Sequence, residues 1–338
     1  MIYVVTFVIL LFPAIYGNNH TGVYYNLDES LPKDLPSVIA NTKLKEDYNM
    51  NTTHMILVDS SVAGSDVKKM SQEIEKVDGV KWVLGLDNLV GSGVPADMLP
   101  ESVTGMLKND KYQLLMVNST YKVATDKVNK QIEQIDKIMD KYDKGAMLVG
   151  EGPLTKDLIN ITDTDFKRVS AVSIGIVFVI ILLLFKSVTI PVILVGVIEF
   201  AIFVNMGIPF YTGTKLPFVA SIVIGTIQLG ATVDYAILMT TRYQRERSRG
   251  AGKFDAITTA HKFSAQSIIV SALSFFAATI GVGLYSNIDM ISSLCILMAR
   301  GALISMVVVV LILPSLFMVF DKIIVKTSKG FRPTGLKS

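Results

Sequence analysis

One carboxylate, Asp234, interrupts the apolar stretch that runs from Leu216 to Tyr243. The stretch has the length and composition of a membrane-spanning helix. It ends in a basic cluster, Arg242, Arg245, Arg247 and Arg249. Asp234 precedes Arg242 by eight positions, which is roughly 12 Å along a helix and places the acid within the hydrocarbon. A carboxylate there costs roughly 3 kcal/mol on insertion scales, so it faces protein or water or binds a proton. The chemistry predicted is reversible protonation.

The residues around Asp234 support this interpretation. Thr226, Gly230 and Asp234 recur every four positions and therefore share one face of a helix. Thr226 and Gly230 are small, which lets a neighbouring helix pack closely beside the acid. Tyr235 follows directly and carries a phenol that can donate a hydrogen bond to a carboxylate or accept one. We predict a proton relay of Asp234 and Tyr235, with Thr226 and Gly230 as packing residues.

The segment from Gly230 to Tyr235 reads GATVDY. It resembles the GxxxDY signature in the fourth helix of each half of MMPL-type transporters, which belong to the resistance-nodulation-division (RND) superfamily. The pattern gains specificity because the predicted span continues into RYQRERSRG. The stretch MARGALISMVVVVLILPSLFMVFDK also looks like the family's closing helix. The resemblance covers essentially the whole chain, as one half of a two-half transporter and most like the C-terminal half.

The resemblance implies a function and partners. In the family, the Asp-Tyr pairs of the two halves meet at the centre of the membrane domain, and proton flow there drives movement of the porter domains. Asp234 and Tyr235 would supply one pair, and a second transporter half or a second copy of the chain would supply the other. The implied function is export of lipids or other hydrophobic molecules, powered by the proton gradient without a metal or other cofactor. We also expect the chain to be a piece of the transporter or the product of a split gene.

The composition agrees with a membrane protein in contact with lipid. Apolar residues make up 51% of the chain and charged residues 18%, and the mean hydropathy is +0.49, which is too apolar for an ordinary soluble protein. Cys295 is the one cysteine, so a disulfide within the chain and a cysteine metal cluster are excluded. We find no Ser/His/Asp set, nucleotide-binding loop or metal-ligand spacing, and lysine-rich helices are typical of solvated faces. We therefore expect neither an enzyme nor a protein that binds nucleic acid.

The chain divides into a membrane part and one long polar segment. Residues 1–17 predict a first transmembrane helix, because the alternative, a signal peptide, would need a basic start and a clear cleavage site. Residues 18–167 are polar, rich in lysine and of domain size. Residues 168–321 hold five further spans, and residues 322–338 form a basic cytoplasmic tail. The five predicted spans are 168–185, 188–210, 216–241, 264–285 and 291–320.

The 18–167 segment predicts an α+β domain. Its order of strand, helix, strand, strand, helix, strand is typical of a ferredoxin-like fold, and it resembles the family's extracytoplasmic porter domain. The expected strands are 54–61, 80–86, 112–120 and 146–151. The expected helices are 34–47, 65–77, 100–108 and 124–142, and a glycine- and proline-marked loop covers 88–99.

Basic residues follow spans two, four and six. The positive-inside rule then places both termini in the cytoplasm and residues 18–167 outside the cell membrane. The basic loop 242–263 is cytoplasmic in this arrangement, and residues 254–263 are expected to form a short interfacial helix. The predicted fold class is an α-helical membrane protein, with six spans in a 1 + 5 arrangement around one extracytoplasmic α+β domain.

Further polar residues lie within the predicted spans. Glu199 is either a second carboxylate in the proton path or an acid paired with a polar neighbour in the bundle. Gln228, together with Thr232, predicts hydrogen bonds between helices or a role in hydrating the proton path. Arg300 either pairs with a carboxylate or extends toward the headgroups. Glu199, Gln228 and Arg300 form a candidate secondary polar site.

Two alternatives to a proton-driven exporter remain open. A SecF-like protein-export subunit also has six spans, one external domain and an acid in its fourth helix. Against it, the segment DYAILMTTRYQRE lacks that family's usual run. A sterol- or lipid-sensing receptor of the Patched-like kind belongs to a different functional class, and an ionisable pair in the middle of the membrane argues against a passive sensor.

Overall fold

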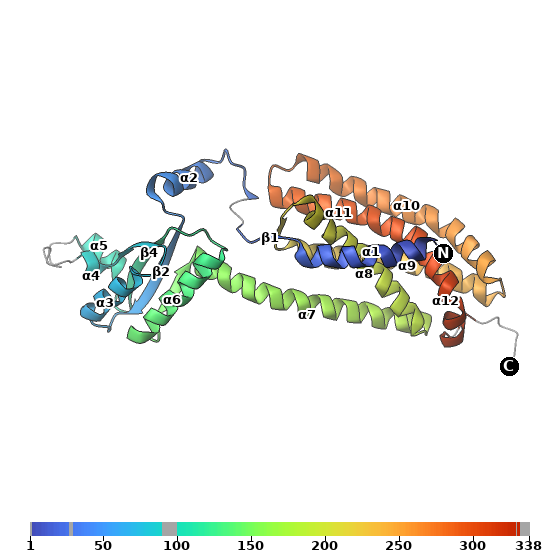
Figure 1. Ribbon diagram of the computed structural model, residues 1–338, viewed down its shortest axis with the longest axis horizontal. Helices are drawn as coiled ribbons and strands as arrows, with labels where there is room; N and C mark the ends of the chain where they lie inside the picture. The colour runs from blue at the N-terminus through green and yellow to red at the C-terminus, as the bar shows by residue number, and fades with distance from the viewer. Residues whose placement is uncertain (1, 27–29, 90–99, 329, 332–338) are drawn as a thin grey trace. The chain divides into compact units, whose positions relative to one another are not determined.

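The computed structural model describes residues 2–26, 30–89, 100–328 and 330–331. The protein chain forms two compact units (Figure 1). The sheet unit is Leu31–Asp163, and the helical unit combines Met1–Ser30 with Thr164–Ser338. The loop expected at 88–99 lies mostly outside the described residues.

The sheet unit has a mixed architecture. The four strands of its sheet, in the part of the chain that is described, are β2 (Thr52–Asp59), β3 (Val80–Leu84), β4 (Tyr112–Ser119) and β5 (Met147–Gly150). They lie in the order β3-β4-β2-β5, and each pairs antiparallel with its neighbours. Alternate residues of β2 are buried, as expected for a strand with one covered face.

Two amphipathic helices, α3 (Gly64–Ile74) and α6 (Asp126–Tyr142), supply the rest of this core. Helix α6 begins after Thr125, whose Oγ1 accepts a hydrogen bond from the backbone N of Val128 at 3.3 Å. The apolar side chains of both helices meet those of β2 and β4: Ile56, Val58, Val67, Met70, Ile74, Leu115, Val117, Ile135 and Met139. Burying each large apolar side chain is worth about 1.5–3 kcal/mol, so the unit has a core of its own. The remaining helices are α2 (Pro36–Tyr48), α4 (Leu86–Leu89) and α5 (Glu101–Leu107).

The helical unit contains long apolar helices. Six stretches among the described residues are long and apolar enough to cross a membrane, which agrees with the predicted number. The first five are α1 (Ile2–His20), α7 (Glu151–Phe185), α8 (Thr189–Thr212), α9 (Ala220–Ser248) and α10 (Lys253–Tyr285). The sixth, Asp289–Thr327, consists of α11 (Asp289–Val307), a π-helical segment (Val308–Ile312) and α12 (Leu313–Thr327).

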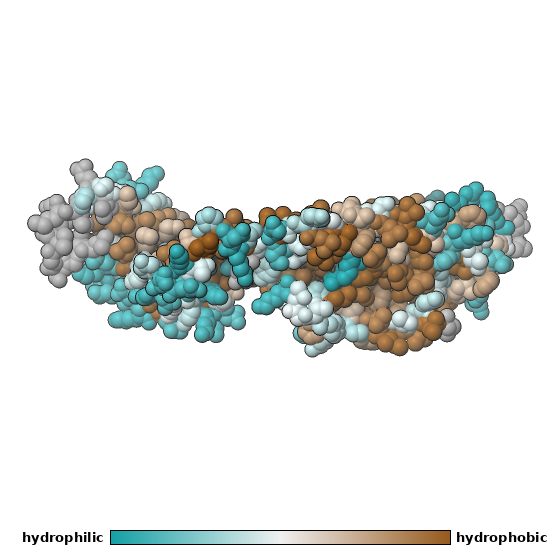
Figure 2. Space-filling view, turned by 90° about the horizontal axis from the view of Figure 1, so that it is seen from above, coloured by the Kyte–Doolittle hydropathy of each residue, from teal (hydrophilic) through white to brown (hydrophobic). Residues whose placement is uncertain are grey.

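The surface of the helical unit is strongly apolar. Figure 2 shows hydrophobic side chains over the visible face of this unit and hydrophilic ones gathered at its end. Helix α7 illustrates the exposure, with Val172 59% and Leu183 66% accessible. Apolar surface on this scale is covered by lipid or by other helices in a membrane protein.

Helix α1 packs directly against α8 through two glycines. A Cβ atom added to Gly17 would lie 2.8 Å from the backbone O of Gly207, and one added to Gly207 would lie 2.9 Å from the backbone O of Ala14. The phenol of Tyr211 donates a hydrogen bond to the backbone O of Pro13 at 2.9 Å. Close backbone approach of this kind is typical of helix packing in membranes.

The boundary between the units differs from the one expected at residue 18. Residues up to Ser30 belong to the helical unit, because strand β1 (Val23–Tyr24) pairs in parallel with β6 (Leu216–Pro217). In addition, the phenol of Tyr24 donates to Oδ2 of Asp289 at 2.8 Å. Pairing between two-residue strands far apart in sequence leaves no periodic pattern to detect.

Helix ends also differ from expectation. Residues 254–263 form no separate interfacial helix, because α10 is continuous from Lys253 to Tyr285. Similarly, α7 starts at Glu151, well before the span predicted from residue 168. Hydropathy marks the apolar part of a helix, whereas the helix itself continues wherever its backbone hydrogen bonds do.

Candidate functional site

Asp234 lies near the middle of α9 with its side chain exposed. Thr226 and Gly230 lie on the same exposed face. A Cβ atom added to Gly230 would meet no atom within 4 Å, so no helix in the described part of this chain packs there. The hydroxyl of Thr226 donates to the backbone O of Ile222 at 2.7 Å and is therefore satisfied within α9. The face around Asp234, formed by Thr226, Gly230 and Asp234, is open.

Tyr235 points to a different side of α9. Its side chain is only 6% exposed, in the core of the helical unit. Successive residues of a helix are about 100° apart, which separates it from the exposed carboxylate of Asp234. No hydrogen bond joins the two side chains in the described structure. Tyr235 therefore anchors the buried side of α9 while Asp234 occupies its open side.

A buried polar network lies inside the same bundle, on α8, α9 and α11. Arg300 donates through Nε to Oδ1 of Asn205 and through Nη2 to its backbone O, both at 2.8 Å. Asn205 donates through Nδ2 to Oε1 of Gln228 at 2.8 Å and to the backbone O of Leu297 at 3.0 Å. The structure thus brings Gln228 and Arg300 together through Asn205. We expected Arg300 to pair with a carboxylate or to extend toward the headgroups. In the described residues it donates instead to the side-chain amide oxygen and the backbone oxygen of Asn205.

The network continues toward α11. Nε2 of Gln228 donates to Oγ of Ser305 at 3.2 Å, and Oγ1 of Thr232 donates to the same oxygen at 2.7 Å. A pocket of about 10 Å³ borders Gln228 and Ser305, close to the roughly 10–15 Å³ that one water needs. Gly301 makes the network possible, since a Cβ there would lie 2.7 Å from Nδ2 of Asn205.

Glu199 does not join this network. It is half-buried on α8, and within the described ranges its carboxylate has no recorded hydrogen bond or ion pair. The candidate secondary polar site therefore splits, with Gln228 and Arg300 in one cluster and Glu199 apart from it.

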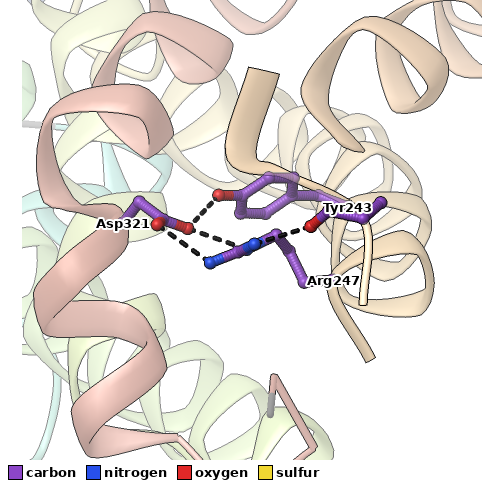
Figure 3. Close-up of polar contacts among 4 residues, drawn as sticks. Tyr243, Arg247 and Asp321 are labelled. Carbon is purple, nitrogen blue, oxygen red and sulfur yellow. Dashed lines mark hydrogen bonds and ion pairs between the residues drawn. The ribbon is translucent and has the colours of Figure 1, made fainter. Parts of the chain in front are cut away.

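A third polar cluster joins α9 to α12 (Figure 3). The phenol of Tyr243 donates to Oδ1 of Asp321 at 2.5 Å, and Nη2 of Arg247 donates to Oδ2 at 3.0 Å. Nη1 of Arg247 also reaches the backbone O of Ala251 at 2.7 Å. Asp321 is only 5% exposed, so its charge is balanced within the protein. The cluster lies nine residues beyond Asp234, about 14 Å along α9.

Sequence reasoning missed Asn205, Ser305 and Asp321. Asn205 offered a signal, because it is an amide within the apolar run FAIFVNMGIPF. Ser305 and Asp321 offered little, since serine is common in membrane helices and Asp321 stands at the edge of the last apolar run. In the described residues, no group of three or more His, Cys, Asp or Glu side chains lies close enough to hold a metal ion.

Comparison with known proteins identifies the family. Residues 30–333 match the sequence pattern of the family described as "MMPL family". The chain is 24% identical over 274 residues to the membrane protein YdgH of Bacillus subtilis, covering 74% of this chain and 28% of YdgH. It is 23% identical over 280 residues to "Probable transport protein MmpL1" of Mycobacterium tuberculosis, covering 75% and 27% of the two chains.

A further relative covers more of this chain. "Probable transport protein MmpL4" of Mycobacterium leprae is 22% identical over 302 residues, which is 85% of this chain and 31% of MmpL4. The chain therefore spans less than a third of the length of these curated relatives. With a family match across nearly all its residues and six apolar helices, the chain is a multi-pass membrane protein that belongs to the MMPL family of the RND superfamily.

Proposed function

We propose that this chain forms one half of a proton-driven exporter of lipids or other hydrophobic molecules, in which Asp234 binds and releases the proton. The observation that carries the proposal is the exposed carboxylate of Asp234 near the middle of α9, a helix that can cross a membrane. Left against lipid, such a group costs roughly 3 kcal/mol on insertion scales. A second polar surface or a proton must offset that cost.

The second surface, in this proposal, is the matching helix of the other transporter half. The open face of Thr226, Gly230 and Asp234 has room for a helix at close range, because Gly230 carries no side chain and no described residue occupies the space beside it. Two-fold pairing would bring two carboxylates together, and like charges at short range favour the binding of a proton. Such a pair responds to a proton gradient by gaining and losing charge.

The buried network has a supporting role. Asn205, Gln228 and Arg300 fix the opposite side of α9 against α8 and α11, so the open face is held in position. Tyr235 packs on that fixed side and belongs to the relay as the residue that couples the acid to the bundle. One proton crossing 100 mV releases about 2.3 kcal/mol, which is enough to bias a movement of packed helices.

The sheet unit is the porter domain in this proposal. Its antiparallel order β3-β4-β2-β5 with α3 and α6 on one face supports the ferredoxin-like arrangement. The basic residues in the last turns of α9 and α12 support a cytoplasmic location for those helix ends. The helices would then cross the cell membrane, with the sheet unit on its extracytoplasmic side. The names of MmpL1 and MmpL4 as transport proteins support the same class of function.

The test compares two carboxylates in one assay. The chain, reconstituted in liposomes with the half that completes it, is given a pH gradient, and efflux of a hydrophobic fluorescent reporter is followed. Asp234→Asn keeps shape and hydrogen-bonding capacity but cannot ionise, so gradient-driven efflux should be lost while the protein folds normally. Glu199→Gln is the matched control and should retain most of the efflux. Tyr235→Phe keeps the buried ring and removes a phenol that makes no recorded hydrogen bond within the described residues, so it should reduce efflux much less than Asp234→Asn does.

The outcome that overturns the proposal is equally direct. If Asp234→Asn exports at the wild-type rate, Asp234 is not the proton carrier. If Glu199→Gln abolishes efflux and Asp234→Asn does not, the proton path runs through α8 instead.

A further inference from the structure

A cavity of about 240 Å³ opens between the end of α9 and the first part of α10. Arg242 and Arg245 on α9 and Arg249 directly after it line one side, and Thr259 and Phe263 on α10 line the other. The arginines are three and four positions apart, so their side chains project from one helix face. The cavity is many times larger than the roughly 10–15 Å³ that admits one water.

The cavity keeps an excess of positive charge. Glu246 also lines it and pairs with Arg249, with Nη1 of Arg249 at 3.0 Å from Oε1. The guanidinium groups of Arg242 and Arg245 have no recorded ion pair or hydrogen bond to any described residue, and both are exposed. Two arginines are thus free to bind an anion. Arginine is suited to phosphate because its planar fork donates two parallel hydrogen bonds.

The depth of the cavity indicates where the anion comes from. At 1.5 Å per residue, Arg242 and Arg249 lie about 12 and 22 Å from Asp234 along α9. The hydrocarbon of a bilayer extends about 15 Å from its centre, and the headgroups end at about 20–22 Å. With Asp234 near the middle of the membrane, Arg242 lies just inside the edge of the hydrocarbon, from which its long side chain can extend to the headgroups. Arg245 and Arg249 then lie at headgroup level.

An exposed aromatic side chain accompanies the arginines. Phe263, which lines the cavity, is 60% exposed. Large apolar rings beside cationic groups suit the boundary between acyl chains and headgroups. A soluble anion would make no use of them.

We propose that this cavity binds the phosphodiester headgroup of an anionic membrane lipid. The phosphate lies between Arg242 and Arg245, the hydroxyl of Thr259 is available to donate to a phosphate oxygen, and the acyl chains run past Phe263. Basic pockets between transmembrane helices on the cytoplasmic side recognise acidic headgroups in this way. The inference shares with the proposed function the placement of Asp234 near the middle of the membrane and the cytoplasmic location of the end of α9, but it does not require that Asp234 binds a proton.

The test uses the purified full chain and two lipids with identical acyl chains. Bound lipid is counted by native mass spectrometry in titrations with phosphatidylglycerol, which is anionic, and phosphatidylcholine, which is zwitterionic. The wild-type chain should prefer phosphatidylglycerol. Replacing Arg242 and Arg245 together by glutamine should weaken its binding by roughly 30-fold, from the contribution of two basic residues at a membrane surface.

A matched control removes the same charge elsewhere. Lys322 and Lys326 are exposed on α12 and do not line the cavity, so replacing both by glutamine should leave the preference intact. Replacing Arg242 and Arg245 by lysine keeps the charge and should retain part of it. If the Lys322/Lys326 variant loses the preference for phosphatidylglycerol equally, the lipid is attracted by surface charge in general. If the Arg242→Gln/Arg245→Gln variant keeps the preference unchanged, the lipid binds elsewhere. Either result overturns the proposal.

A third arm distinguishes lipid from soluble anion. Glycerophosphoglycerol, which is the same headgroup without acyl chains, and inorganic phosphate are offered as competitors at equal concentration. Little displacement of phosphatidylglycerol supports the lipid assignment. Full displacement by either soluble anion would overturn it and make the cavity a site for soluble phosphate compounds.

Discussion

Asn205 connects Arg300 to Gln228 in the interior of the helical unit. It accepts from Nε of Arg300 at 2.8 Å and donates to Oε1 of Gln228 at 2.8 Å, and its side chain is fully buried. One amide therefore satisfies a guanidinium on α11 and an amide on α9. Gln228 is buried and Arg300 is partly buried, so the stability of the bundle depends on this residue.

Replacing Asn205 by leucine should destabilise the protein. The change leaves Arg300 and Gln228 without their shared partner, and each unsatisfied buried polar group costs about 1–3 kcal/mol. The expected loss is therefore at least about 2 kcal/mol in the free energy of unfolding, measured by SDS titration in detergent with circular dichroism. Thr226→Val is the control, because the hydroxyl of Thr226 is exposed and bonds only within α9. Equal stability of the two variants would contradict the account of the network.

Gly301→Ala should disturb the same network by steric conflict. The new methyl group would lie 2.7 Å from Nδ2 of Asn205 and 2.8 Å from Oε1 of Gln228, closer than real Cβ contacts. Overpacking of this kind costs typically about 1–3 kcal/mol. Gly281→Ala on α10 meets no atom of the described residues within 4 Å and should be neutral or slightly stabilising, because alanine favours a helix. Melting temperatures in detergent should therefore be lower for Gly301→Ala than for Gly281→Ala. Equal melting temperatures would contradict the predicted steric conflict.

The sequence predicted the number of membrane helices and the strand pattern of the sheet unit from periodicity and hydropathy. These signals are local, and they are strong where one face of a strand or a whole helix is apolar. What periodicity could not predict was pairing between distant segments. The bridge of β1 to β6 and the contact of Tyr24 with Asp289 depend on how the helices are arranged.

The candidate site shows the same division. Asp234 stood out because a charge in an apolar run is costly wherever the helix packs. Asn205, the partner of Arg300, could not be identified in the same way. The sequence does not tell which of several polar groups in neighbouring helices lies opposite a guanidinium. The role of Asn205 depends on α8, α9 and α11 meeting at Gly301, which is a property of the packed bundle.

Arg247→Gln should weaken the attachment of α12 to α9. The side chain of Asp321 is buried, and Nε of Arg247 lies 3.0 Å from its Oδ1. Removing one partner of a buried ion pair costs about 3–5 kcal/mol, because the other charge stays buried and unpaired. The same SDS titration should show a large loss for Arg247→Gln and partial recovery when Asp321→Asn is added. Lys322→Gln, on the exposed side of α12, should change little.

If the double variant is no more stable than Arg247→Gln alone, the unpaired charge of Asp321 is not the cause. The phenol of Tyr243 would then be the main partner of that carboxylate. Tyr243→Phe measures this contribution separately, since it removes one hydrogen bond and leaves the ion pair in place.

The last prediction concerns the pH dependence of the sheet unit. His54 lies on the buried side of β2, fully enclosed, with Nε2 3.3 Å from Oε1 of Gln131. Burial lowers the pKa of its imidazole from the ordinary 6.5, and the hydrogen bond to Gln131 raises it in part. The folded state therefore binds this proton less readily than the unfolded state does.

The sign of the effect follows from that difference. The stabilisation is fully present above the unfolded pKa of about 6.5, and it is lost as the pH falls toward the lower, folded pKa. Trp82 is the one tryptophan of the chain and lies on β3, so its fluorescence reports unfolding of this unit in the full-length protein. Urea titrations should give a lower free energy of unfolding at about pH 5.5 than at about pH 7.5, because only histidine ordinarily titrates in that range. In His54→Gln the difference should shrink, since no other histidine lies in residues 31–163; an unchanged difference would assign the pH dependence to another group.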